Sequence, residues 1–470
     1  MGRFKVGVAA FCLLVGASAG LRGQQISPEL KGKIDVAVKQ VMEKTGVPSA
    51  AVGSVQGGRV VFTAGYGEAR ITPPVTAQAE MRYPIGSISK QFTAACVLLL
   101  AEDGKLTLDD PVSKWFPELT RSNEVTLRNL LTHTSGYEDY APQDYTIPAW
   151  TKPIRPLELV HVWGEKPLDF DPGTKWQYSN TNFVIAALIV EKASGEPYWN
   201  FLSTRVLQPL GLSGAVNLDT DRDKVQPQGY MQNALAAVRP AILEAPGWYF
   251  GDASLAMPVA DLLRWDISVM NRTLLKSASY DAFETDMKLK DGTSTGYGLG
   301  VQVLVRDGRR VVTHSGEVGG FVAQNTLFPD DKVAVAVLTN QEASPAAGAI
   351  ARAVAPLVLG GTGAPVAKEA SAAGAQVKQI LSGLQAGKID RSLFTEDCNF
   401  YFSRETMDDF SSSLGKLGEV MTVKQTGEQL RGGMTFRRFQ VEFGGGTGVV
   451  VTTYTTADGK LEQFLVEGKS

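Results

Sequence analysis

A serine and a lysine three residues apart, Ser87 and Lys90, stand directly before a strongly apolar run at residues 92–100. The run predicts a buried helix, and Gly104 is placed to end it. Positions i and i+3 share one face of a helix, so the Lys90 amine can reach the Ser87 hydroxyl. Burial favours the neutral amine of a lysine, which can then accept the serine proton. This segment therefore predicts a rigidly held nucleophile at the start of a core helix.

Two further motifs follow in chain order. A Tyr-x-Asn motif, from Tyr178 to Asn180, precedes a second apolar helical run. A His-Ser-Gly motif, which begins at His314, lies between strand-like runs at residues 301–305 and 333–338. Each motif alone arises easily by chance, so the fixed order of the three carries the specificity.

Three other motif matches are interpreted as structural. A second Ser-x-x-Lys, at residues 413–416, lies in a polar, serine-rich segment. A second Tyr-x-Asn, at residues 198–200, opens an amphipathic helix. A Lys-Thr-Gly at residues 44–46 ends a helix predicted over residues 29–44, with Gly46 as its cap.

With these motifs in this order, the chain resembles the penicillin-recognising serine hydrolases. The nearest branch comprises class C β-lactamases, D-aminopeptidases, DD-peptidases and esterases. Residues 129–136 and 170–173 also resemble signatures of this family, and the resemblance covers roughly residues 28–360. It implies an α+β fold of the β-lactamase/transpeptidase type. An antiparallel sheet, built from both chain ends and flanked by helices, packs against an inserted all-helical lobe, with the active site between them.

The resemblance also implies a role for each motif residue. Ser87 attacks a carbonyl to form an acyl-enzyme, and either Lys90 or Tyr178 takes its proton, a choice that stays open. Asn180 holds a substrate amide or the Lys90 amine. The oxyanion hole consists of the N–H groups of Ser87 and Glu317. The predicted substrate-binding residues are Asn180, Ser315, Gly316 and Glu317.

His314 departs from the family pattern. Penicillin-hydrolysing members usually carry a lysine there, which supplies a permanent cation for the antibiotic carboxylate, whereas a histidine is only partly charged at neutral pH. This substitution weakens a β-lactamase prediction and resembles the D-aminopeptidase and esterase branches. We expect His314 to assist Tyr178, whose phenolate is costly near neutral pH unless cations lie close, and to hydrogen-bond the substrate.

The N-terminus resembles a signal peptide. Arg3 and Lys5 precede an apolar run at residues 6–15, and Ala-Ser-Ala follows at residues 17–19. The run is short for a membrane span, and a retained anchor is the alternative. We therefore expect residues 1–19 to be removed and the protein to be exported, either periplasmic or secreted. No other stretch of the sequence is apolar and long enough to span a bilayer.

Charge and composition exclude several classes of function. The formal net charge of −3 provides no basic surface for nucleic acid. Three histidines, His133, His161 and His314, are widely separated, and no clustered Cys/His spacing predicts a metal or a cofactor. We expect Cys96 and Cys398 to be free and buried, although a disulfide between them stays open.

The chain is too long for one ordinary core. A Gly/Ala-rich stretch at residues 361–375 predicts a linker between a hydrolase domain, residues 28–360, and an accessory α+β domain, residues 376–470. The accessory domain bears a faint resemblance to NTF2-like cone-shaped domains. Its predicted helices lie at residues 377–385 and 405–417, and its predicted strands lie at residues 435–443, 448–455 and 461–467. For the accessory domain we consider two alternatives of equal weight. It either takes part in dimerisation or shapes access to the cleft, or it has a purely structural role.

Two functions from different classes follow. The first is an exported serine hydrolase that cleaves an amide or ester bond of a small molecule or peptide through a Ser87 acyl-enzyme. Among hydrolase activities, those of an esterase and of a D-amino-acid peptidase are the first candidates, and β-lactamase activity is the alternative. The second is a catalytically weak sensor or binder of cell-wall peptides. Intact Ser87, Lys90 and Tyr178 favour the enzyme, because a binder does not need a proton relay. The sequence leaves the substrate and the oligomeric state open.

Overall fold

The computed structural model describes residues 26–360 and 373–468, which form a sheet with flanking helices, a helical lobe and a C-terminal unit. The predicted signal peptide lies outside the described residues. So does most of the predicted linker, but helix α10 (Ala373–Gln385) already includes its last three residues.

The main sheet is antiparallel and has seven strands in the order β3-β2-β1-β12-β11-β10-β9. It is built from both ends of the hydrolase region, as expected. The early hairpin with Gly57 and Gly58 in its turn pairs β1 with β2. The strands are β1 (Ser49–Gln56), β2 (Arg59–Arg70), β3 (Val75–Thr76), β9 (Gln302–Arg306), β10 (Arg309–Val318), β11 (Phe321–Phe328) and β12 (Val333–Thr339).

Both faces of the sheet are buried, which explains the continuous apolar run in β12. Val333, Val335 and Val337 pack into a cluster with helices α1 (Pro28–Thr45) and α9 (Ala346–Leu359), whereas Ala334 and Ala336 face the opposite core. This alternation follows from the two-residue period of a strand. Helix α1 (Pro28–Thr45) begins at the Ser27 cap and ends at Gly46, which adopts φ 72° as its capping role requires.

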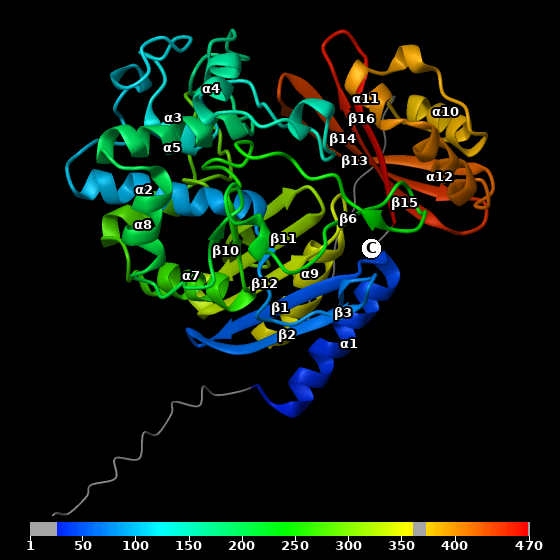
Figure 1. Ribbon diagram of the computed structural model, residues 1–470, viewed down its shortest axis with the longest axis horizontal. Coiled ribbons are helices and arrows are strands. Elements are labelled where there is room, and N and C mark those ends of the chain that lie inside the picture. Colours follow the sequence, from blue (N-terminus) through cyan, green and yellow to red (C-terminus); the bar gives the residue numbers. More distant parts are fainter. Residues whose placement is uncertain (1–25, 361–372, 469–470) are drawn as a thin grey trace, which may run out of the picture.

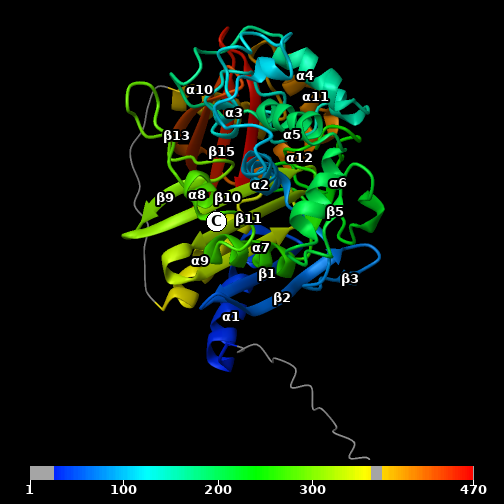
Figure 2. The same cartoon turned by 90° about the vertical axis from the view of Figure 1, so that its left-hand side faces the viewer.

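Helix α9 (Ala346–Leu359) covers the same face as α1, and α7 (Val259–Asn271) covers the other face (Figures 1 and 2). The lobe stands on the α7 side of the sheet. Its helices are α2 (Ser89–Glu102), α3 (Leu127–Leu131), α4 (Pro156–Gly164), α5 (Asn180–Ser194), α6 (Tyr198–Leu202) and α8 (Ser277–Phe283). Short strands connect it: β4 (Tyr83–Pro84), β5 (Val216–Asn217), β6 (Tyr230–Met231), β7 (Arg239–Pro240) and β8 (Leu255–Met257).

The C-terminal unit, orange to red in Figure 1, packs three helices on a four-stranded antiparallel sheet. Two of its elements, α11 and β13, are absent from the sequence-based prediction. The elements are α10, α11 (Glu396–Tyr401), α12 (Arg404–Leu414), β13 (Val420–Arg431), β14 (Met434–Phe443), β15 (Gly448–Thr455) and β16 (Leu461–Gly468).

The C-terminal unit contacts the hydrolase region beside the helical lobe. The backbone of Tyr178 forms a parallel bridge with Arg431 at the end of β13. Asp144 N donates to Gln463 Oε1 over 2.8 Å, and Tyr145 Oη donates to the Glu462 carbonyl over 2.7 Å. The C-terminal unit therefore contacts two segments of the hydrolase region, one at residues 144–145 and the other at Tyr178 of the second predicted motif.

Two further features of the described residues bear on the sequence-based expectations. Cys96 and Cys398 are both buried and free, as expected. Across residues 26–360 and 373–468, we find no helix with the length and apolar character needed to cross a membrane.

Candidate active site

The nucleophile motif begins in a single 3₁₀ turn, Gly86–Ile88, that leads directly into α2. Every residue of α2 from Ser89 to Leu100 is buried, so the helix is fixed within the core. Lys90 is fully buried, and its Nζ donates to Ser87 Oγ over 2.9 Å. The predicted contact between serine and lysine is therefore present, with Ser87 itself lining a cleft.

Asn180 lies at the first position of α5 and completes the setting of Lys90. Its Oδ1 accepts a hydrogen bond from Lys90 Nζ over 2.7 Å. Its Nδ2 donates to Asp139 Oδ1 over 3.0 Å and to the Ala141 carbonyl over 3.2 Å. Of the two roles expected for Asn180, the geometry places it on the lysine amine.

Tyr178 lines the cleft, and Lys90 Nζ lies 5.0 Å from the centre of its ring. Its hydroxyl has no hydrogen-bond partner among the described residues. The Arg431 guanidinium lies 5.1 Å from the same ring. The phenol hydroxyl is thus unengaged, and two basic side chains lie close to its ring.

His314 is placed differently from the expectation. Tyr297 Oη donates to its Nε2 over 2.7 Å, and its Nδ1 donates to the Ser315 carbonyl. Burial lowers the pKa of the imidazole to about 4, so the ring is neutral. We correct two expectations here: His314 supplies no positive field to Tyr178, and its ring nitrogens are occupied by protein rather than left for substrate. Its ring lies 6.1 Å from that of Tyr178, behind the cleft.

His133 supports the tyrosine from another side. Its ring packs 4.2 Å from the Tyr178 ring, and its Nδ1 accepts from Ser179 N over 3.2 Å. Burial holds the pKa of His133 well below its usual range, so this ring is neutral as well. His133 thus packs against Tyr178 and holds the backbone beside it.

The predicted oxyanion hole depends on a close backbone approach between β10 and the nucleophile turn. A Cβ on Gly316 would lie 1.8 Å from the Ile85 carbonyl and 3.0 Å from Ser87 N, so only glycine fits. A Cβ on Gly86 would likewise lie 2.4 Å from Glu317 N. The N–H groups of Ser87 and Glu317 thus belong to adjoining segments. Ser315 and Glu317 line the cleft, and the Glu317 carboxylate accepts from Ala343 N over 2.6 Å.

Asp252 and Tyr297 belong to the site but were missed by sequence analysis. The Asp252 carbonyl accepts from Lys90 Nζ over 3.2 Å, and its carboxylate lies 3.8 Å from the same nitrogen. Burial raises the pKa of Asp252 to about 7, against the opposing effect of Lys90. Tyr140 Oη donates to Asp252 Oδ2 over 3.1 Å. Neither Asp252 nor Tyr297 belongs to a motif that could have indicated it.

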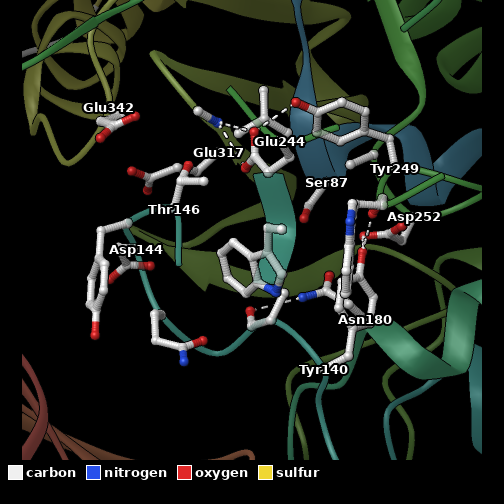
Figure 3. A pocket seen from close by; sticks show the side chains of 18 of the residues that line it. Ser87, Tyr140, Asp144, Thr146, Asn180, Glu244, Tyr249, Asp252, Glu317 and Glu342 are labelled. Carbon is white, nitrogen blue, oxygen red and sulfur yellow. Dashed lines mark hydrogen bonds between the residues drawn. The ribbon is translucent and has the colours of Figure 1, made fainter. Parts of the chain in front are cut away.

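The cleft in front of Ser87 has a volume of about 250 Å³ and two kinds of wall (Figure 3). Tyr140, Trp150, Trp248 and Tyr249 provide aromatic surface. Carboxyl groups form the other wall: Asp144, Glu317 and Glu342 lie across the cleft from Asn180 and Asp252 in Figure 3. A further lining carboxylate, that of Glu244, accepts a hydrogen bond from Tyr249 Oη over 2.6 Å.

The acidic wall is poor in compensating charge. Burial raises the pKa of Glu342 to about 8 and holds the pKa of Glu317 well above its usual range. Among the described residues that line the cleft, Arg431 is the one side chain with a permanent positive charge. The carboxyl groups of Glu317 and Glu342 are therefore protonated near neutral pH, and a cationic group of a ligand beside them would stabilise their ionised forms, whereas an anionic group would not.

Motif matches set aside from the sequence lie apart from this cleft. Tyr198 is buried, and its Oη shares a 2.6 Å hydrogen bond with Thr93 Oγ1. Ser413 lies in α12 of the C-terminal unit. In the part of the chain that the structure describes, no group of three or more His, Cys, Asp or Glu side chains is arranged to hold a metal ion.

Comparison with known proteins identifies relatives of this fold and site. The beta-lactamase family model matches residues 34–359. Penicillin-binding protein 4* of Bacillus subtilis (strain 168) is 28% identical over 305 residues, which cover 62% of this chain and 67% of that protein. A D-aminopeptidase of Brucella anthropi is 26% identical over 320 residues, which cover 66% of this chain and 59% of that protein.

Among solved structures, the octameric penicillin-binding protein homologue from Pyrococcus abyssi aligns with a TM-score of 0.64 and 22% identity. The alignment covers 93% of this chain and 99% of that chain, so the likeness in fold extends into the C-terminal unit, beyond the family match.

The fold and these relatives define a class, the serine hydrolases with a β-lactamase fold. The chain belongs to the beta-lactamase family, whose model matches more than half of its length.

Proposed function

We propose that this protein is a serine hydrolase that cleaves an amide or ester bond through an acyl-enzyme on Ser87. The observation that carries the proposal is the 2.9 Å hydrogen bond between a fully buried Lys90 amine and Ser87 Oγ, beside the unengaged hydroxyl of Tyr178. A sensor does not need a proton acceptor beside its serine, whereas a nucleophile does.

The reaction has two steps, acylation of Ser87 and hydrolysis of the acyl-enzyme. Ser87 Oγ attacks the substrate carbonyl and loses its proton to Lys90 or Tyr178, and the resulting oxyanion accepts hydrogen bonds from the N–H groups of Ser87 and Glu317. The relay then returns the proton to the leaving amine or alcohol as the bond breaks. Water attacks the acyl-enzyme by the same route, which releases the acid and restores the Ser87 hydroxyl.

For the substrate, we propose a small amide or peptide whose acyl residue carries a free amino group, as in the D-amino-acid substrates of an aminopeptidase. The acidic wall supports this choice, since an ammonium group beside Glu317 and Glu342 would stabilise the ionised forms of these carboxyl groups and pair with them. The neutral His314 argues against β-lactams, which carry a carboxylate. The aromatic wall suits the side chain of that residue.

The test is hydrolysis by the purified protein and its S87A variant. The substrates are D-alanine p-nitroanilide, L-alanine p-nitroanilide, N-acetyl-D-alanine p-nitroanilide, a p-nitrophenyl ester, a D-Ala-D-Ala peptide and nitrocefin. We expect Ser87-dependent turnover, with kcat/KM for D-alanine p-nitroanilide about tenfold or more above its N-acetylated analogue, because acetylation removes the cation.

Equal rates for the free and acetylated anilides would refute the ammonium proposal but leave the hydrolase intact. If no substrate turns over and a fluorophosphonate fails to label Ser87, the protein is a binder or sensor instead.

We also propose that the protein acts outside the cytoplasm after removal of residues 1–19. The support is the basic, apolar and small-residue pattern of that segment. Mass spectrometry of protein purified from the producing cell should then find Gly20 as the first residue. A mature chain that still contains residues 1–19 would contradict removal.

A further inference from the structure

The hairpin between β13 and β14 reaches from the C-terminal unit into the active site. Its turn consists of Gly432 and Gly433, both with positive φ, at 57° and 69°. This conformation is that of a tight hairpin turn, which strongly prefers glycine. A Cβ on Gly432 would lie 3.1 Å from Pro142, so the turn sits directly against the loop that borders the cleft. Arg431 is the last residue of β13 and lines the cleft itself.

The Arg431 side chain is mostly buried, with 18% of its surface exposed. Its Nε donates to Asp139 Oδ2 over 3.0 Å, and its Nη2 donates to the Ala141 carbonyl over 2.9 Å. Its Nη1 donates to Tyr454 Oη over 3.1 Å, which fixes the guanidinium from the side of its own unit. The Asp139 side chain is fully buried, and a buried carboxylate needs a paired cation.

Asp139 in turn fixes the amide of Asn180. Its Oδ1 accepts from Asn180 N over 2.9 Å and from Asn180 Nδ2 over 3.0 Å. An ionised carboxylate can only accept hydrogen bonds, so the amide nitrogen must face Asp139 and the amide oxygen must face away. That oxygen is the one that holds Lys90 Nζ at 2.7 Å, next to Ser87. A continuous series of contacts thus runs from Arg431 to the nucleophile.

We propose that Arg431 is a positioning residue of the catalytic centre: it compensates the charge of Asp139 and thereby holds Asn180 and Lys90 in register with Ser87. The C-terminal unit is then a part of the active site rather than a cover over an apolar surface. This inference rests on the proposed acylation of Ser87, whose relay it explains.

The test uses the full-length protein and the rate of fluorophosphonate labelling of Ser87, separated into a maximal rate and a half-saturation concentration. R431A should lower the maximal rate about tenfold to a hundredfold, because small displacements of a catalytic group are costly, while half-saturation changes little. R437A is the matched control: Arg437 lies on β14, pairs with Glu428 over 2.8 Å and does not line the cleft, so its labelling should equal the wild type.

One rescue and one double variant separate positioning from mere docking of the hairpin. Methylguanidinium in solution should restore labelling of R431A and leave R437A unchanged, since the vacated space opens on the cleft. D139N should lower labelling by itself, and R431A/D139N should label no more slowly than D139N alone, because Arg431 acts through the Asp139 carboxylate. If R431A does not fold, R431K against R431Q replaces it, and the lysine variant should label faster.

The outcomes are distinct. Wild-type labelling in folded R431A, or a loss that methylguanidinium does not relieve and that adds fully to the loss in D139N, would overturn the positioning role and leave Ser87 acylation intact. An unlabelled wild-type protein would refute Ser87 acylation, and with it the relay that Arg431 is proposed to support.

Discussion

His314 occupies the place of a permanent cation in penicillin-hydrolysing relatives, yet here its imidazole is neutral. Burial favours the uncharged ring, and both nitrogens have partners, Tyr297 Oη and the Ser315 carbonyl. The permanent positive charge near Tyr178 comes instead from Arg431, whose guanidinium lies 5.1 Å from the tyrosine ring. The histidine thus orders the wall behind the tyrosine, and its protonation is coupled to folding.

This coupling gives a pH-dependent stability. The pKa of His314 falls from about 6.5 in the unfolded chain to about 4 in the folded protein, so below pH 6.5 the unfolded state binds the extra proton. The stabilisation is complete above pH 6.5 and is lost as the pH falls towards 4. Between pH 7 and pH 5 we expect wild type to lose about 2 kcal/mol of unfolding free energy that H314Q does not lose. Denaturant unfolding at both pH values measures this difference, and parallel losses in the two proteins would contradict it.

At the residue scale, sequence predicts what local spacing and motif order encode. Ser87 and Lys90 share a helix face, so their contact follows from spacing alone. Asp252 and Tyr297 reach the same centre from distant loops, and an isolated aspartate or tyrosine carries no spacing signal. The charge of His314 was also beyond the sequence, because it depends on burial and on Tyr297 rather than on the motif.

At the scale of elements, prediction follows amphipathic pattern. Helix α1 and strands β14 to β16 were predicted within a few residues, since each buries one regular face or run. Strand β13 was missed because most of its side chains are partly or fully exposed and its sequence, rich in Thr, Gln and Glu, lacks an apolar alternation. Pairing with β14 holds this strand in place, and the sequence of β13 alone does not indicate that pairing. The missed strand is also the one that carries Arg431.

At the scale of the whole molecule, the C-terminal unit and the hydrolase region share one buried hydrophobic cluster. Polar contacts add to it: Arg239 of β7 pairs with Asp409 and Glu405 of α12, and Asn233 Nδ2 donates to Asp409 over 3.0 Å. Residues so far apart in the chain carry no common pattern, so sequence alone left the role of this unit open. The shared core predicts that the two parts unfold together.

Reversal of the charge at Arg239 tests this coupling, because it places three carboxylates together at the junction. The side chains of Arg239 and Asp409 are 26% and 17% exposed, so we expect R239D to lower the unfolding free energy by about 2 kcal/mol. Its labelling by fluorophosphonate should fall with it, since Arg431 would leave Asp139. R239D/D409R restores opposite charges and should recover both properties in part.

The matched control is R205D, which breaks the exposed pair of Arg205 with Asp103 inside the helical lobe and should change stability by less than about 1 kcal/mol. Calorimetry measures the stability of each variant, and labelling rates measured on the same samples show whether the active site depends on the docked C-terminal unit. A wild-type protein with two separate thermal transitions, or an R239D variant that loosens the C-terminal unit yet labels at the wild-type rate, would show that the catalytic centre is complete without it. Loss of stability and labelling together in R239D, with both recovered by D409R, would tie the active site to the docked unit through the contact of Arg431 with Asp139.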